Sequence, residues 1–201
     1  MANMLRLSGK NPKYYYFQDE NELPYLVHLF RQSQYRYLHF SSHGEPNEIL
    51  TTNGSISYMR FAAIFKRHLI LRRMFFSACE LGNDLFTEVL AGSNNGMHSI
   101  AAPIHQIYFH DAAAIWNVLY LSLFQLEGTK MKHRQIIEKL IAIRKLFPVD
   151  FHFSGYNSNT NKWHYHTIDA AYKLENFPIK PVQATHPKQQ GVLPQKKKSK
   201  K

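Results

Sequence analysis

Short apolar runs alternate with segments of helical periodicity along most of this chain, and this alternation constrains the fold more than any other feature. Residues 35–40, 69–77 and 97–102 are rich in apolar side chains, which is typical of buried strands. Between these runs, apolar residues recur at helical spacing. Strands separated by helices form a mainly parallel sheet with helices on both faces. We therefore expect an α/β fold, a three-layer αβα domain with a mainly parallel central sheet.

The same alternation of predicted strands and helices extends toward both ends of the sequence. Ser57, Asp84 and Asp111 stand where the N-cap of a helix is expected, because their side chains can accept a hydrogen bond from the first turn. The remaining expected elements are a strand at 14–17, a helix after Pro24, a loop through Pro46 and Gly54, helices at 57–67, 84–92, 111–126 and 130–146, and an antiparallel hairpin of strands at 151–156 and 163–168.

Composition divides the chain into three parts. With 201 residues, 44% of them hydrophobic, the chain can close one sizeable core. The formal net charge is +11, but residues 178–201 contain seven lysines and no acidic residue, which leaves +4 for the first 177 residues. We expect a polar lead at 1–12, one folded domain at 13–177, and a disordered lysine-rich tail at 178–201.

Several classes of protein are disfavoured. No apolar run approaches the roughly 18 to 20 residues that a transmembrane helix needs. The first residues lack the apolar middle of a secretory signal. A single cysteine, Cys79, leaves no internal disulfide, zinc ribbon or thioredoxin-type motif. We expect a cytoplasmic protein without a membrane span.

Two reactive residues follow predicted strands. His43 ends the run that starts at Tyr37, and Cys79 ends the run that starts at Met74. In an open α/β sheet, ligands bind at the carboxyl ends of the strands. If these two strands are neighbours, both side chains meet at one edge of the sheet. The sequence therefore predicts a His/Cys site there.

That pairing has a chemical purpose. A free thiol has a pKa near about 8.5, so a nucleophilic cysteine needs a base or a cation to form thiolate at neutral pH. His43 can act as this base for Cys79. Gly44 lets the backbone approach a substrate closely. The backbone N–H groups of Gly44 and Cys79 can then form an oxyanion hole.

These segments resemble CHAT domains, which belong to the caspase-like cysteine peptidases. The resemblance covers about residues 35–125. Its motifs are Leu38-His39-Phe40-Ser41-Ser42-His43-Gly44, then Phe76-Ser77-Ala78-Cys79-Glu80-Leu81-Gly82, then Gly96-Met97-His98-Ser99-Ile100-Ala101-Ala102-Pro103, and lastly His110-Asp111-Ala112-Ala113 with Val118-Leu119-Tyr120.

The resemblance implies a caspase-like fold and an endopeptidase in which His43 is the base and Cys79 the nucleophile. A peptide bond in a protein substrate would be cleaved through a thioester, with no cofactor and no metal. By analogy with family members that favour basic side chains, Glu80, Asp84 and Asp111 are candidates for the wall of the substrate pocket. A regulatory protein partner is a further expectation, since many members belong to longer proteins with sensor repeats.

Other readings of the same residues stay open. Cys79 can be a small buried hydrophobe, or can pair with a downstream His98, His105 or His110. A catalytically silent caspase-like module that binds a partner protein is the main alternative to a peptidase. The pair His164 and His166 lies on one face of a predicted strand, a spacing compatible with metal binding.

Basic residues suggest a further class of function. The tail from Lys196 to Lys201 can contact nucleic acid or an anionic surface through charge alone. It has no aromatic residue on which bases could stack. A second basic run, free of acidic residues, either is a solvated surface or biases the potential around Cys79; it comprises Arg60, Lys66, Arg67, Arg72 and Arg73.

Overall fold

The structure is a computed structural model that describes residues 1–126 and 131–176. The expected tail at 178–201, including Lys196 to Lys201, lies outside the described residues. The elements are, in order, α1 (Ala2–Leu7), α2 (Leu23–Gln32), β1 (Tyr37–Ser41), β2 (His43–Gly44), β3 (Glu48–Thr51), β4 (Gly54–Ser57), α3 (Tyr58–Ile64), β5 (Arg73–Ser77), α4 (Asp84–Ser93), β6 (Ser99–Pro103), α5 (Phe109–Leu126), α6 (His133–Leu146), β7 (Phe151–Asn157), β8 (Lys162–Ile168) and a short 3₁₀ turn at Leu174–Asn176.

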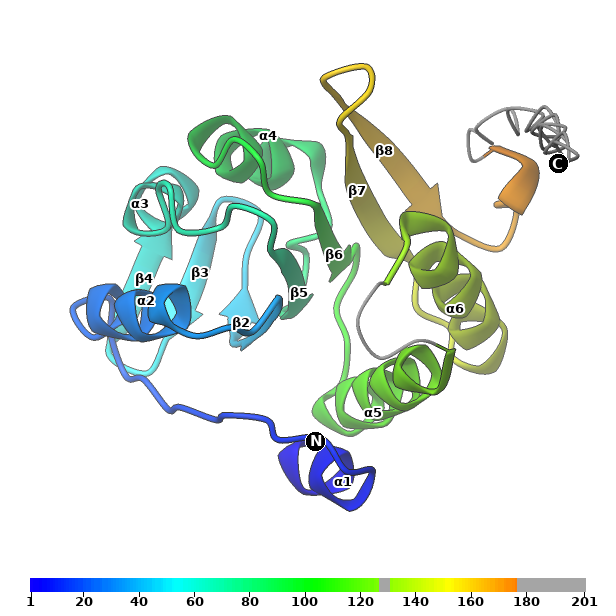
Figure 1. Ribbon diagram of the computed structural model, residues 1–201, viewed down its shortest axis with the longest axis horizontal. Coiled ribbons are helices and arrows are strands. Elements are labelled where there is room, and N and C mark those ends of the chain that lie inside the picture. The colour runs from blue at the N-terminus through cyan, green and yellow to red at the C-terminus, as the bar shows by residue number, and fades with distance from the viewer. Residues whose placement is uncertain (127–130, 177–201) are drawn as a thin grey trace, which may run out of the picture.

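A five-stranded sheet with the order β1-β5-β6-β7-β8 forms the centre of the fold (Figure 1). Strands β1, β5 and β6 pair in parallel, and β7 pairs antiparallel with both β6 and β8. The predicted α/β class and mainly parallel sheet are therefore confirmed, as is the late hairpin. A separate three-stranded antiparallel sheet, β2-β3-β4, lies beside the carboxyl end of β1.

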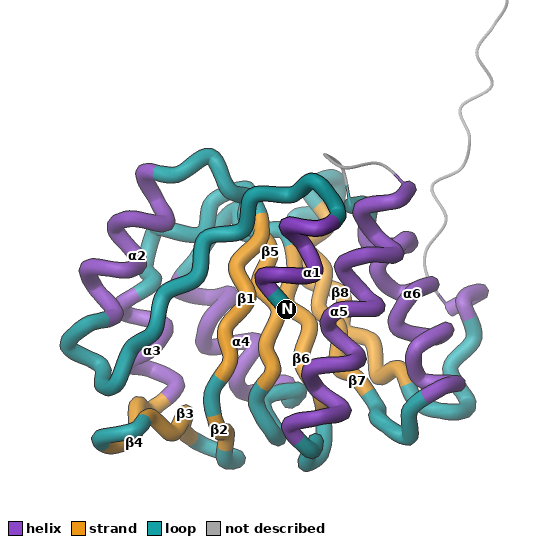
Figure 2. Tube along the Cα trace, turned by 90° about the horizontal axis from the view of Figure 1, so that it is seen from below, coloured by secondary structure: helices purple, strands orange, loops and turns teal. Residues whose placement is uncertain are grey.

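Helices cover both faces of the central sheet (Figure 2). On one face, α2, α3 and α4 pack against the sheet through buried side chains that include Val27, Phe61 and Phe86. On the other face, α5 and α6 pack through residues such as Trp116 and Ile137. Alternation along β5 explains this division, because its successive side chains enter opposite cores.

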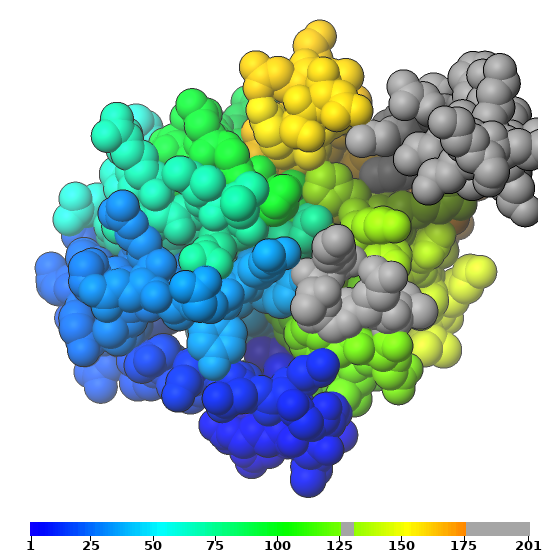
Figure 3. Space-filling view, viewed as in Figure 1, coloured from blue at the N-terminus to red at the C-terminus, as the bar shows by residue number. Residues whose placement is uncertain are grey.

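One prediction near the N-terminus is wrong. Residues 14–17 form no strand, and their tyrosines are exposed, since no neighbouring strand offers this aromatic run a hydrogen-bonding partner. The lead at 1–12 contains α1, which contacts α5 and buries Leu5 on that side of the sheet. In Figure 3 the blue N-terminal segment lies next to the green residues of α5. A polar sequence thus hides one apolar contact that tertiary packing uses.

The segment after β1 also differs from its prediction as a loop. It forms the β2-β3-β4 sheet, in which Ile49 pairs with Ile56 and both are buried. Glu45 N–H donates to Glu48 C=O and closes the first turn at 2.9 Å. The turn-forming residues that suggested a loop serve as the connections of two short hairpins.

Helix caps fall close to their predicted positions. Ser57 is the N-cap of α3, and its side chain accepts from Arg60 N–H. The N-cap of α4 is Asn83 rather than Asp84, since the Asn83 side chain accepts from Phe86 N–H at 2.7 Å. Asp111 lies in the first turn of α5, which begins two residues earlier. Across the described ranges, no helix has the length and apolarity required to cross a bilayer.

Candidate functional site

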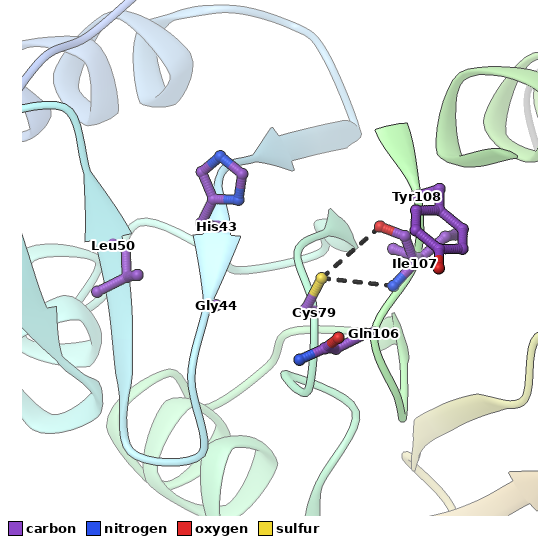
Figure 4. Close-up of a pocket in the computed structure, with 7 residues that line it drawn as sticks. All are labelled: His43, Gly44, Leu50, Cys79, Gln106, Ile107 and Tyr108. Atoms are coloured by element: carbon purple, nitrogen blue, oxygen red, sulfur yellow. Dashed lines mark hydrogen bonds between the residues drawn. The ribbon is translucent and has the colours of Figure 1, made fainter. Parts of the chain in front are cut away.

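Neighbouring strands bring His43 and Cys79 to the same edge of the sheet. Strands β1 and β5 pair in parallel up to Ser41 and Ser77, so each reactive residue follows the last paired position by two. Both side chains line one pocket with a volume of about 370 Å³ (Figure 4). The other lining residues are Gly44, Leu50, Gln106, Ile107 and Tyr108.

Gly44 allows the two segments to touch. A Cβ built on Gly44 would lie 2.1 Å from the carbonyl oxygen of Cys79 and 3.2 Å from Leu81 Cγ. No side chain fits in that space, so the close approach of β2 to the Cys79 segment requires glycine. This explains in physical terms why glycine follows His43.

The loop after Cys79 is held by several hydrogen bonds. Glu80 adopts a left-handed conformation with φ of 60°, which is uncommon for a residue with a side chain. Asn83 Nδ2 donates to the Glu80 carbonyl oxygen at 2.7 Å, and Gly82 N–H donates to Pro103 C=O at 2.8 Å. These bonds fix the position of Cys79 against the end of β6.

Tyr58 ties this loop to the β2-β3 hairpin. Its hydroxyl donates to the Glu45 carbonyl oxygen at 2.7 Å and accepts from Asn83 Nδ2 at 3.2 Å. Burial raises the pKa of Tyr58, opposed by the Asn83 hydrogen bond and reinforced by the Glu80 charge. The phenol therefore stays protonated and keeps both sides of the pocket connected.

The thiol of Cys79 contacts the backbone of Ile107. The sulfur accepts from Ile107 N–H at 3.4 Å, and its S–H points to the Ile107 carbonyl oxygen at 3.8 Å (Figure 4). A donated N–H favours the anionic form of a sulfur atom. Sequence reasoning missed Ile107, although its place just after β6 at the carboxyl edge of the sheet was available as a signal.

His43 stands apart from the thiol. Its side chain is exposed on β2, whereas Cys79 is half-buried in the loop across the pocket (Figure 4). Within residues 1–126 and 131–176, no hydrogen bond joins the imidazole to the thiol. The two residues share the pocket, and rotation of the exposed His43 side chain is needed before a proton can pass directly between them.

The predicted acidic residues lie in different places. Glu80 lines a second hollow of about 450 Å³, next to the first, together with Pro46, Asn83, Leu85, Ile104 and His105. Asp84 is 75% exposed and lies 3.7 Å from His152 Nε2. Asp111 lies 3.6 Å from His110 Nε2. The lining of these two hollows includes Glu80 but neither Asp84 nor Asp111.

The alternative histidine partners do not join the pocket that contains Cys79. His98 precedes β6 and donates its backbone N–H to Arg72, which places it at the opposite edge of the sheet. His105 lines the second hollow, 4.0 Å from Asp150. His110 stacks on Tyr108 with a ring-centroid distance of 5.7 Å.

Two members of the basic run, Arg72 and Arg73, lie away from the thiol. Arg72 and Arg73 stand at the start of β5, and Cys79 follows its end. Their charges therefore act on the amino-terminal edge of the sheet rather than on the pocket. As for metals, no group of three His, Cys, Asp or Glu side chains suited to an ion is present in the part of the chain that the structure describes, the His164 and His166 strand included.

The site thus combines a half-buried thiol, an exposed imidazole and a glycine-dependent contact in one pocket. Leu50, Gln106 and Tyr108 complete its walls, and sequence reasoning did not single them out. They come from β3 and from the loop after β6, two segments whose positions depend on tertiary structure. Neither a protein-family model nor a curated protein sequence matches this chain.

Proposed function

We propose that this protein is a cysteine endopeptidase of the CHAT or caspase-like type, with Cys79 as nucleophile and His43 as base. One observation carries the proposal: the two residues follow neighbouring parallel strands and line the same pocket. The helices on both faces of a mainly parallel sheet are compatible with a caspase-like three-layer arrangement. The order of His before Cys along the chain also agrees with that family's motifs.

The proposed reaction proceeds through an acyl-enzyme. The thiol proton passes to His43 as the sulfur attacks the carbonyl carbon of the scissile peptide bond. When the C–N bond breaks, His43 returns the proton to the leaving amine, and the acyl group stays on Cys79 as a thioester. Water then attacks the thioester, which releases a carboxylate and restores the thiol. In this proposal the N–H groups of Gly44 and Cys79 stabilise the oxyanion.

The pocket chemistry supports an extended peptide as substrate. Leu50, Ile107 and Tyr108 offer an apolar wall, and Gln106 adds an amide beside it. Glu80 in the neighbouring hollow supplies a negative charge for a basic substrate side chain. Asp84 and Asp111 would contribute only if loops rearranged, since neither lines these hollows.

A second candidate is a catalytically silent module that binds a partner protein at the same edge. The contact of the thiol with both backbone groups of Ile107, and the exposed position of His43, favour this alternative. Activation by a partner protein would convert one candidate into the other, by moving His43 toward the thiol. The nucleic-acid hypothesis depends on Lys196 to Lys201, outside the described residues.

The first test is the rate of iodoacetamide alkylation as a function of pH. Because Cys79 is the only cysteine of the chain, the signal has one source. We expect the rate to reach a plateau well below pH 8, and the His43→Ala variant to lose that plateau. His105→Ala serves as the matched control, since this exposed histidine belongs to the neighbouring hollow. A midpoint near or above about 8.5 in all three proteins would reject the activated dyad.

The second test is hydrolysis of a fluorogenic peptide library. Activity that disappears in Cys79→Ser and drops at least about a hundredfold in His43→Ala, the scale of general-base catalysis, supports the peptidase. An activated thiol without hydrolysis of any peptide would favour the silent module. Circular dichroism of both variants shows whether the fold is retained.

A further inference from the structure

Four residues that pair with one another across neighbouring strands form a row at the amino-terminal edge of the central sheet, opposite to Cys79. Arg73 pairs with Ser99 across β5 and β6, Ser99 pairs with Gly155 on β7, and Gly155 pairs with His164 on β8. Along their strands, Arg73, Ser99 and Gly155 each lie two positions from a residue that packs against α5 and α6, and His164 lies four positions from one. These core residues are Phe75, Ala101, Phe153 and Ile168. Side chains two residues apart share a face, so the whole row faces the α6 side of the sheet.

Two histidines from other segments lie next to this row. His133 is the first residue of α6, and its Nδ1 would lie 2.8 Å from a Cβ built on Gly155. His98 directly precedes β6, where its carbonyl oxygen accepts from Tyr156 N–H at 2.9 Å. A hydrogen bond links the His133 ring to the His98 backbone. Three basic side chains, Arg73, His98 and His133, therefore meet from three separate segments.

The guanidinium of Arg73 lacks a counter-charge within the described ranges. It donates to Ser99 Oγ at 2.9 Å, and no carboxylate there pairs with it. Burial lowers the pKa of Arg73 to about 10, so the group remains a cation at neutral pH. A guanidinium has five N–H donors, and a buried cation without a partner is costly.

The surrounding charges have the same sign. Burial lowers the pKa of His98, and the nearby charges of Arg73 and Arg36 lower it further. Burial likewise lowers the pKa of His133 to about 3, with Arg73 and His98 adding to the effect. At neutral pH both imidazoles are therefore uncharged and have one ring N–H each. The N–H of His133 is used in its hydrogen bond to the His98 backbone, whereas the N–H of His98 can be donated to an acceptor.

A buried imidazole nitrogen at the end of the row has no hydrogen-bond partner within the described residues. The Nε2 atom of His164 is buried and has no hydrogen-bond partner within the described part of the chain. Buried polar atoms are normally paired, so an unpaired one asks for an explanation. Arg73, His98, His133 and His164 all keep part of their surface exposed.

We propose that Arg73 and His98, next to His133, form a binding site for an oxyanion of the phosphate class, at the edge of the sheet opposite to the candidate peptidase site. Ser99 and His164 flank the site along the row. The donors come from β5 and from the residue that precedes β6. The bound anion supplies the negative charge that Arg73 lacks, and binding does not depend on any activity of Cys79.

Inorganic phosphate is the first probe, with the full chain. At equal ionic strength and pH 7.5, phosphate should raise the melting temperature above its value in chloride for the unmodified protein. Arg73→Met and His98→Gln should each weaken the phosphate affinity at least tenfold. Lys66→Met is the matched control, because it removes an exposed charge on the α3 side and should leave the affinity unchanged. Equal phosphate effects in all four proteins would overturn the proposal.

A second measurement needs no variant, in case Arg73→Met fails to fold. Proton NMR of the histidine C2 protons in the unmodified protein should show the His98 and His133 signals moving with phosphate and not with chloride. Signals that stay fixed would overturn the proposal. O-phosphoserine forms the last arm: tighter binding than inorganic phosphate identifies a phosphorylated group as the ligand, and weaker binding identifies the free ion.

Discussion

The two edges of the central sheet carry reactive and basic side chains in opposite settings. At the carboxyl edge, His43 is exposed and Cys79 is half-buried, and hairpin and loop segments shape an open pocket between them. At the amino-terminal edge, burial lowers the pKa of Arg73 to about 10 and that of His133 to about 3. The same parallel strands thus present a half-buried thiol at one end, and a desolvated arginine beside two uncharged histidines at the other.

The two edges therefore differ in how strongly the charge state of their side chains is coupled to the stability of the fold. His43 and Cys79 on the carboxyl edge line an open pocket and lie outside the two hydrophobic cores. Groups on the amino-terminal edge are tied to the core, and protonation there acts against folding. The comparison leads to four predictions, ordered by the size of the expected effect.

Acid should destabilise the fold through its buried histidines. Burial lowers the pKa of His39 and His133 to about 3, from the 6.5 of an unfolded chain. Between these values the unfolded chain binds protons that the native state does not. The free energy of unfolding should therefore fall as the pH drops below about 6.5, by up to about 1.4 kcal/mol per pH unit for each histidine.

Urea unfolding in chloride buffers between pH 7 and 4 measures this slope. His133→Gln should flatten it by one histidine's share, whereas His110→Gln, on a side chain that is 80% exposed, should leave it as it is. If His133→Gln gave the same slope as the unmodified protein, protonation of His133 would not be coupled to folding. The difference in stability between the two edges would then be contradicted.

Gly44→Ala should disturb the carboxyl edge more than Gly155→Ala disturbs the other. The added Cβ at Gly44 meets a backbone oxygen at 2.1 Å, so we expect a loss of about 3 kcal/mol and slower Cys79 alkylation. At Gly155 the nearest atom belongs to the His133 ring, which can rotate, so the loss should be about 1 kcal/mol. Denaturant unfolding of both variants provides the measurement; equal losses would contradict it.

Asn83→Ala should weaken the loop that holds Cys79. The change removes the α4 N-cap and the hydrogen bonds to the Glu80 carbonyl and Tyr58 hydroxyl, for a loss of about 2 kcal/mol. Ser57→Ala removes the α3 cap alone and should cost about 1 kcal/mol with unchanged alkylation kinetics. If both variants altered alkylation to the same extent, the loop would not be what positions the thiol.

Arg72→Met should have the smallest effect of the four. Its guanidinium lies 5.3 Å from the Phe30 ring centroid and donates to the Ser33 carbonyl oxygen, in a partly exposed setting. We expect a loss of about 0.5 to 1 kcal/mol in thermal unfolding. Phosphate binding should survive, which separates Arg72 from its neighbour Arg73. Loss of phosphate binding in this variant would instead extend the cluster to the α2 side.

The sequence was informative where a local pattern determines structure. The alternation of strands and helices predicted the α/β class, and the strand ends predicted the residues that meet in the pocket, His43 and Cys79. Ser57 was recognised as a cap from its own chemistry. Asn83 was missed in favour of Asp84, since both types cap helices and only the backbone conformation chooses between them.

Features that depend on strand pairing escaped sequence reasoning. Tyr14 to Tyr16 has the composition of a strand but no sheet partner, whereas the turn-rich segment after Gly44 pairs with itself. The cluster of Arg73, His98 and His133 joins positions far apart in sequence, and only the register of four strands brings it together. Ile107 acts through backbone atoms, which no residue type can signal.

Because Cys79 is hydrogen-bonded to the backbone of Ile107, the reactivity of its sulfur depends on the position of the nearby start of α5. Ile107 lies two residues before Phe109, the first residue of α5, and both Tyr108 and Phe109 are exposed at this junction. A ligand that shifts this junction moves the N–H and C=O groups that contact the thiol. The alkylation rate of one cysteine therefore records, without any added label, whether the start of a long helix has moved.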